Sequence, residues 1–203
     1  MEHVGATYPL VTATGTAFII NSWCSQGLFQ RLMKVTNNES DNTTLLEIDS
    51  TFCKVHQSAC CSLKNQAIGV SRGGKNTKIH VLLNERMQVF NVVLSAGQVH
   101  DSEMALDLLG NFNLVGKKIL ADKAYSSEHI RYYLQEHGAV ACIPDKSNFK
   151  IKHDFDSELY KQRNKVERFF QRIKNYRHIA TRYDKLAQCF LNFVLLATTV
   201  IHF

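Results

Sequence analysis

The sequence has little proline, no internal repeat and no long apolar run. Only two of its 203 residues are proline and 45% are hydrophobic, a balance that excludes a disordered or fibrous chain. A chain of this length buries roughly 70% of the surface that its unfolded form exposes, so it can form a full hydrophobic core without disulfide bonds. The composition therefore predicts one soluble globular domain, or at most two.

The six cysteines do not follow the pattern of a structural metal site. None belongs to a CxxC pair, and Cys60 and Cys61 are sequence neighbours, which is a poor arrangement for tetrahedral zinc. A reduced, cytosolic chain is therefore expected. The longest apolar stretch, residues 189–203, is too short to cross a bilayer of about 30 Å, and no basic residue precedes the apolar residues 16–20. We expect neither a membrane span nor a signal peptide.

Positive charge is concentrated in one segment. The whole chain carries a net charge of +6, whereas residues 146–185 contain twelve Lys and Arg against five Asp and Glu, a net +7. A solvated helical face accounts for many such charge runs. A polyanionic partner is the alternative interpretation.

The hydrophobic pattern after residue 44 switches repeatedly between strand and helix periods. It predicts strands at 45–53, 78–83, 88–94, 118–121 and 140–143. It predicts helices from Asp101, as N-cap, to Gly110, from Ser126 or Ser127 to about 138, at 158–176 and at 185–202. Residues 84–87 join a hairpin and 145–157 form a loop. This order indicates a mixed α/β layer rather than a helical bundle or a β-sandwich.

Two aspartates occupy positions that a purely structural role explains poorly. Asp49 lies inside an apolar strand pattern, where an ionised carboxylate loses its hydration, and Asp122 follows a strand that reads as buried. A capping or turn role accounts for most single aspartates of this kind. Neither residue identifies a site by itself.

A third carboxylate, Glu167, lies on a helix with three distinct faces. At 100° per residue, Tyr160, Arg163, Glu167 and Lys174 fall within about 60° of one another. The predicted core face holds Val166, Phe169, Ile173 and Tyr176, and a third face holds Lys161, Lys165, Arg168 and Arg172. An exposed Arg163 to Glu167 ion pair would explain two of the stripe residues but not Tyr160 or Lys174.

The spacing Tyr160-x2-Arg163-x3-Glu167-x6-Lys174 resembles the Y-(2)-R-(3)-E-(6)-K signature of bacterial insertion-sequence transposases of the DDE class, in the insertion sequence four/five superfamily. The resemblance covers about residues 45–203. It includes IDST at 48–51, KVH at 54–56, SRGG at 71–74, TKIH at 77–80, SAGQVHDS at 95–102, ADKAYSS at 121–127 and RHIATRYDK at 177–185.

This resemblance implies an RNase H-like fold with Asp49 on the first strand, Asp122 on the fourth and Glu167 on a later helix. These three carboxylates would be the catalytic and metal-binding residues of a DNA transposase. Two Mg²⁺ ions about 3.5–4 Å apart, or Mn²⁺ as a substitute, would activate the attacking oxygen and stabilise the leaving one. The implied partner is duplex DNA, both transposon ends and target, bound by a homodimer in the bacterial cytosol or nucleoid, with no small-molecule substrate.

Further residues gain roles by the same analogy. Tyr160, Arg163 and Lys174 would hold phosphates of the transposon end. The other candidates for DNA contact are Lys78, Arg72, Lys123, Arg168 and Arg172. Three more residues are candidates for positioning the metal- and DNA-binding side chains: His80, His100 and Tyr125. For the histidines, His56 included, a hydrogen-bonded structural role is an equally good interpretation.

The N-terminal region departs from the family pattern. Residues 1–44 are too few for the helix-turn-helix-like unit and linker expected before a catalytic domain at 45–203. Residues 23–34 resemble the family's helix ahead of the core, whereas 10–22 do not. One codon choice that residues 9–23 permit, read one nucleotide earlier, encodes an aromatic-rich segment like the family's, so we expect a truncated segment that is frame-damaged at 10–22.

Two other functions compete with the transposase interpretation. A non-catalytic remnant could bind DNA through the basic segment and interfere with an intact copy. An RNase H-like resolvase or nuclease of another lineage would share the carboxylates, but it has no reason to show the Tyr-Arg-Glu-Lys spacing. Intact carboxylates favour the enzyme, and the altered N-terminus favours the remnant.

Overall fold

The computed structural model describes residues 43–60, 63–110, 112–147, 149 and 152–201, together with 22, 23, 26–28, 31, 32 and 35. The expected frame damage at 10–22 lies, apart from Ser22, outside the described residues. The boundary expected at residue 44 falls one residue before the first strand, Leu45–Val55.

Seven strands of the described chain form one mixed sheet. They are β1 Leu45–Val55, β2 Gly69–Ser71, β3 Gly74–Asn84, β4 Val89–Ala96, β5 Lys118–Ala121, β6 Val140–Cys142 and β7 Thr181–Arg182. The main order is β4-β3-β1-β5-β6, with β2 paired to β3 and β7 paired to β1. β1 runs antiparallel to β3 and parallel to β5. This mixed sheet with helices on both faces is the predicted RNase H-like fold.

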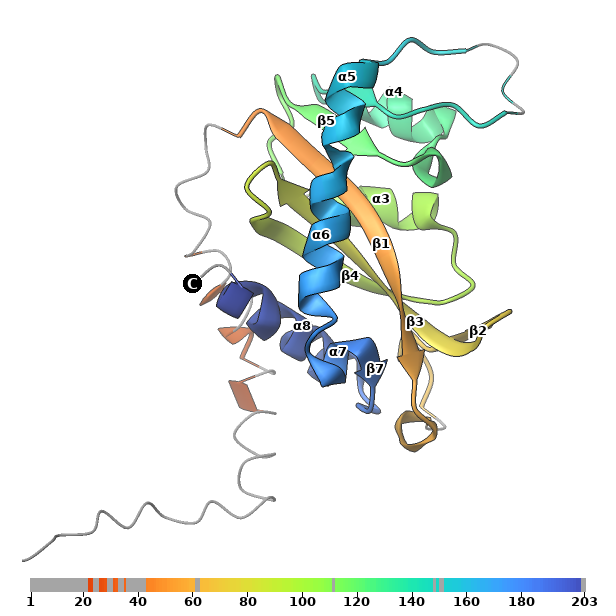
Figure 1. The fold of residues 1–203 in the computed structure, drawn as a ribbon, viewed down its shortest axis with the longest axis vertical. Helices are drawn as coiled ribbons and strands as arrows, with labels where there is room; N and C mark the ends of the chain where they lie inside the picture. The colour runs from red at the N-terminus through yellow and green to blue at the C-terminus, as the bar shows by residue number, and fades with distance from the viewer. Residues whose placement is uncertain are drawn as a thin grey trace, which may run out of the picture.

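Helices cover both faces of the sheet (Figure 1). They are α3 Asp101–Leu109, α4 Glu128–Glu136, α5 Ser157–Tyr160, α6 Asn164–Ile173, α7 Arg177–Ala180 and α8 Ala187–Ile201, with short 3₁₀ helices η1 Gln57–Ala59, η2 Lys123–Tyr125 and η3 Lys161–Arg163. In Figure 1, α5 and α6 follow one another across the near face of β1, with α3 behind the sheet. Among the described helices, none combines the length and apolarity needed to cross a bilayer.

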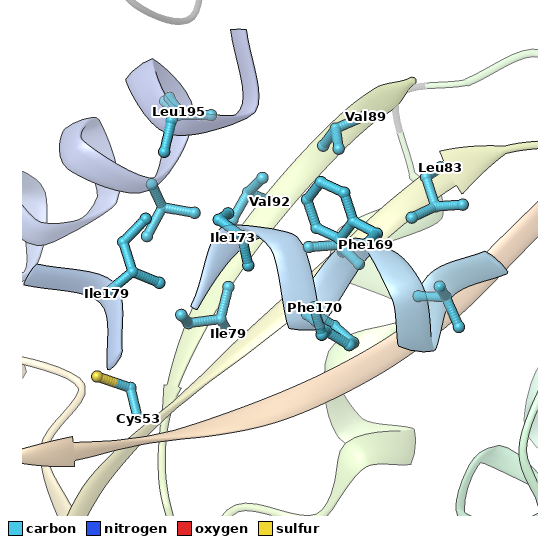
Figure 2. Packing of buried hydrophobic residues seen from close by; sticks show 14 of the residues in the cluster. Cys53, Ile79, Leu83, Val89, Val92, Phe169, Phe170, Ile173, Ile179 and Leu195 are labelled. Carbon is cyan, nitrogen blue, oxygen red and sulfur yellow. The ribbon is translucent and has the colours of Figure 1, made fainter. Parts of the chain in front are cut away.

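The alternation of side chains along β1 separates two cores. Leu46 and Ile48 belong to the cluster that packs under α3 and α4. The opposite face meets α6, where Phe169 and Ile173 pack with Ile79 and residues of β4 and α8 (Figure 2). Because side chains in a strand point alternately to the two faces, the odd-numbered residues between Leu46 and Ser50 face α6.

Four expectations about local structure need correction. The short strand β2 precedes β3, so the strand before Asp122 is the fifth in chain order and not the fourth. The N-cap of α3 is His100 and not Asp101, because the His100 ring accepts the Ser102 N–H while Glu103 completes a capping box. The helix predicted at 158–176 is divided by η3 and ends at Ile173. Tyr176 therefore leaves the core face and is 39% exposed.

Candidate active site

Asp49 lies on the α6 face of β1 with its side chain 17% exposed. The backbone N–H of Ser50 donates to its Oδ1 at 2.8 Å. Burial raises the pKa of Asp49 to about 6, although the Ser50 N–H and the Arg163 charge both favour the ionised form. This carboxylate is held where a further positive charge would stabilise it.

Asp122 is placed beside Asp49 by the pairing of two parallel strands. Ile48 of β1 pairs with Ala121 of β5, so the two aspartates are the next residues on neighbouring strands. Carboxyl ends of parallel strands meet at the same edge of a sheet, where α/β proteins commonly place their sites. Asp122 also caps η2, since its Oδ1 accepts the Ala124 N–H.

Glu167 reaches the same face from α6 and is joined to Asp49 through Arg163. The Nη1 of Arg163 donates to Asp49 Oδ2 at 3.1 Å, and its Nη2 donates to Glu167 Oε1 at 3.1 Å. Glu167 is 58% exposed, whereas Arg163 is 19% exposed. One guanidinium thus links the first and third predicted carboxylates, which lie far apart in the sequence.

Tyr160 borders this group and Lys174 does not. The Tyr160 ring centroid lies 5.8 Å from the Arg163 guanidinium carbon and 5.7 Å from the Phe155 ring. Burial raises the pKa of Tyr160, and the nearby charges of Asp122 and Asp49 add to the effect. Lys174 is the C-cap of α6, about two helical turns beyond Glu167. Within the described ranges it makes no hydrogen bond or ion pair with the three carboxylates.

The donor set suits a hard divalent cation. Asp49, Asp122 and Glu167 offer only carboxylate oxygens, which are the ligands that Mg²⁺ and Mn²⁺ prefer. The part of the chain that the structure describes holds no group of three or more His, Cys, Asp or Glu placed closely enough to bind a metal ion. Arg163 occupies the position between Asp49 and Glu167, so the three carboxylates are neighbours without forming a closed cluster.

Sequence reasoning missed Glu47, a second acidic residue on the α6 face of β1. It is fully buried, and neither carboxylate oxygen has a hydrogen-bond partner among the described residues. Burial raises the pKa of Glu47 to about 7, against the opposing effects of the Lys165 charge and the nearby Val166 N–H. The signal was present in the sequence, because a strand places residues 47 and 49 on the same face.

Lys78 and His80 lie on the other face of the sheet and bond internally. Lys78 donates to Asp101 Oδ1 at 2.9 Å and to the Val99 carbonyl at 2.7 Å. His80 is fully buried, with Nε2 2.7 Å from Ser95 Oγ, and burial lowers the pKa of His80 to about 4. The ammonium and the imidazole are therefore engaged within the protein.

The remaining candidates are scattered around the molecule. Lys123 is exposed directly after Asp122, and Tyr125 is buried in the same turn. Arg72 is exposed in the turn between β2 and β3, away from the carboxylates. His100 caps α3. Arg168 and Arg172 are exposed on α6.

Comparison with known proteins gives a consistent result. A sequence family described as "Transposase DDE domain" matches residues 40–156, and a second family with the same description matches 119–203. A transposase ascribed to insertion sequence element IS6501 of Brucella ovis is 32% identical over 126 residues, which are 62% of this chain and 96% of that protein.

The fold also resembles a solved transposase structure. The piggyBac transposase in a synaptic complex with hairpin DNA superposes with a TM-score of 0.50 at 12% identity, covering 78% of this chain. This chain spans 46% of that protein's length. At this level of identity the likeness concerns the fold alone.

Proposed function

The chain belongs to the transposase DDE domain family, and we propose that it is the catalytic unit that cleaves transposon-end DNA and joins it to a target. The observation that carries the proposal is the strand register that sets Asp49 beside Asp122, with Glu167 tied to Asp49 through one arginine. These residues come from three separate segments of the chain. A shared site explains their convergence better than three separate structural roles.

Asp49, Asp122 and Glu167 would hold the divalent metal ions of this reaction, Mg²⁺ or its substitute Mn²⁺. Bound ions supply an activated water or 3′-hydroxyl and stabilise the departing oxygen. The protein contributes the position of the carboxylates: the β1–β5 pair fixes two of them rigidly, and α6 presents the third. The raised pKa of Asp49 supports this role, since a cation at this place relieves the cost of its buried charge.

The neighbouring cations would bind the DNA. Arg163 has the forked guanidinium that matches a phosphate, and the Tyr160 ring supports it from one side. Exposed Lys123 is well placed for a phosphate that approaches Asp122, whereas Lys174 would act farther along the backbone. Arg168 and Arg172 extend the basic surface along α6. Duplex DNA held at paired ends is the expected partner, bound by two copies of the chain.

Strand cleavage of a labelled duplex that carries the element's inverted repeat, with Mg²⁺ or Mn²⁺ present, tests the proposal. Asp49→Asn, Asp122→Asn and Glu167→Gln should each lower the rate at least about 10³-fold, equivalent to about 4 kcal/mol of transition-state stabilisation. Asp107→Asn and Glu136→Gln are matched controls, because they make the same chemical changes at exposed positions outside the site.

The assay also separates the two candidate functions. Metal-dependent cleavage by the wild-type chain, lost in the three variants and kept in the controls, supports the transposase. Duplex binding without any cleavage would instead support a non-catalytic remnant that competes for DNA. Cleavage that survives loss of any one carboxylate would remove that residue from the proposed site.

A further inference from the structure

Arg163 makes two charged hydrogen bonds to two different carboxylates of the proposed site. Separate nitrogens of its guanidinium bond Asp49 and Glu167, each at 3.1 Å. Arginine cannot lose its proton in a protein, so this side chain is a permanent cation between two of the three proposed metal ligands. A metal ion at the same oxygens must overcome both the loss of these bonds and the repulsion of the charge.

We propose that Arg163 is an internal counter-ion which disfavours metal binding until a DNA phosphate draws it away from Asp49 and Glu167. This inference rests on the proposed function, because it assumes that these carboxylates bind metal ions and that the neighbouring cations bind DNA. The inference adds that bound DNA raises the affinity of the carboxylates for metal.

The position of Arg163 in the chain suits such an exchange. It is the last residue of the 3₁₀ helix η3, between α5 and α6. A 3₁₀ turn inside a longer helical segment has poorer hydrogen-bond geometry and often marks a hinge. Arg163 itself has no side-chain bond that caps α6. Its guanidinium can therefore exchange two carboxylates for a phosphate without breaking the helix that carries Glu167.

A phosphate is a suitable competitor for the guanidinium. It accepts two parallel N–H bonds from one arginine, the same geometry that Arg163 now divides between two residues. Exposed Lys123, beside Asp122, supplies a second cation at the same edge of the sheet. A DNA backbone at this edge would thus find two positive groups, Lys123 and Arg163, beside the carboxylates.

Thermodynamic linkage turns this exchange into a measurable coupling. If bound DNA removes Arg163 from the carboxylates, DNA raises the affinity for metal, and metal raises the affinity for DNA by the same factor. Because Arg163 makes two charge-assisted hydrogen bonds in a partly exposed site, we expect each ligand to raise the affinity for the other by a factor of about ten. Loss of the guanidinium should abolish the coupling while leaving the carboxylates in place.

The test measures Mn²⁺ binding by electron paramagnetic resonance of the free ion, with and without a duplex of arbitrary sequence. Without DNA, Arg163→Gln should bind Mn²⁺ about tenfold more tightly than the wild type. Arg86→Gln is the matched control, since it removes the same charge from an exposed turn between β3 and β4 without touching Asp49 or Glu167, and it should match the wild type. With DNA, only proteins that retain Arg163 should gain affinity.

A second variant guards against misfolding. Arg163→Lys keeps the charge but cannot reach both carboxylates with a planar fork, so its DNA-free affinity should lie between those of the wild type and Arg163→Gln. Circular dichroism of each variant verifies the fold. Equal DNA-free affinities in the wild type and both variants would overturn the inference and leave the proposed function intact. Absence of Mn²⁺ binding by every protein, even with DNA, would overturn the proposed function itself.

Discussion

The two faces of the central sheet differ in how their buried polar and charged side chains are paired. On the α3 face, Lys78 is bonded to Asp101 and a carbonyl, and neutral His80 contacts Ser95. On the α6 face, Asp49 shares one arginine with Glu167, and Glu47 has no hydrogen-bond partner among the described residues. Charges that are paired internally are costly to separate, whereas buried carboxylates with few partners are candidates for binding a ligand.

Breaking the internal pair on the α3 face should have the largest effect on stability. Lys78→Met leaves Asp101, whose side chain is 19% exposed, without its cation, and we expect a loss of about 3 kcal/mol in the free energy of unfolding. Urea denaturation at pH 7 measures this loss. The double variant Lys78→Met with Asp101→Asn should recover most of it, because no unpaired charge then remains. A single variant as stable as the wild type would show that this pair is not structural.

Glu47 should give the α6 face a stability that falls as pH rises. Its pKa is raised in the folded protein from the ordinary value of 4.5 to about 7, so the folded state binds the proton more tightly than the unfolded state. The resulting penalty is absent below pH 4.5, grows between pH 4.5 and 7 and is complete above pH 7, where it amounts to about 3 kcal/mol.

Glu47→Gln should remove this dependence. Unfolding free energies of the wild type and the variant, measured from pH 4.5 to 8, should diverge as pH rises, with the variant more stable at pH 8 by up to about 3 kcal/mol. The pH slope is the decisive quantity, because a buried amide has its own hydrogen-bonding cost that does not change with pH. Parallel curves would mean that Glu47 ionises in the folded protein as readily as in the unfolded chain.

His80 should give the α3 face the opposite dependence. Its pKa is lowered from the ordinary value of 6.5 to about 4, so the unfolded state binds the proton more tightly. This contribution to stability is complete above pH 6.5 and is lost as pH falls toward 4, by about 3 kcal/mol. In His80→Gln this loss should vanish in urea titrations between pH 4 and 7.5. If the variant loses as much stability below pH 6.5 as the wild type does, groups other than His80 cause the loss.

The contrast between the faces shows which parts of the fold a sequence can predict. The strand and helix periods placed β1, β3, β4, β5 and α3 correctly, because each has a buried face with a regular apolar repeat. Short β2 and β7 were missed, since three and two residues carry no period. Tyr176 was assigned to the core by extending one ideal helix past Ile173, where the chain turns into α7.

The candidate site was predictable only as far as local spacing reaches. Glu167 and Arg163 are neighbours on one helix, so their pairing follows from the sequence. The register that sets Asp122 beside Asp49 depends on which strands pair, and the inward orientation of Lys78 depends on a partner 23 residues away. Glu47 was overlooked because one carboxylate among Leu45, Leu46 and Ile48 resembles an interruption of a strand rather than part of a site.

The cations on the solvent side of α6 should produce the smallest effect, because they belong to neither buried face. Arg172 is exposed, so Arg172→Gln should leave the free energy of unfolding within about 0.5 kcal/mol of the wild type. If Arg172 contacts a phosphate, the variant should bind duplex DNA a few-fold more weakly at low salt. The slope of log affinity against log salt should fall in magnitude by about 0.9, and equally for any duplex sequence.

Fluorescence anisotropy titrations across a salt series measure that slope, with Arg86→Gln as the matched control. Arg86 is also exposed but lies in the turn between β3 and β4, outside the basic segment 146–185, so its loss should leave the slope unchanged. Equal slopes for the wild type and both variants would remove Arg172 from the DNA surface. Equal losses in both variants would mean that the DNA responds to net charge alone, and a loss confined to one duplex sequence would show that α6 reads bases as well as phosphates.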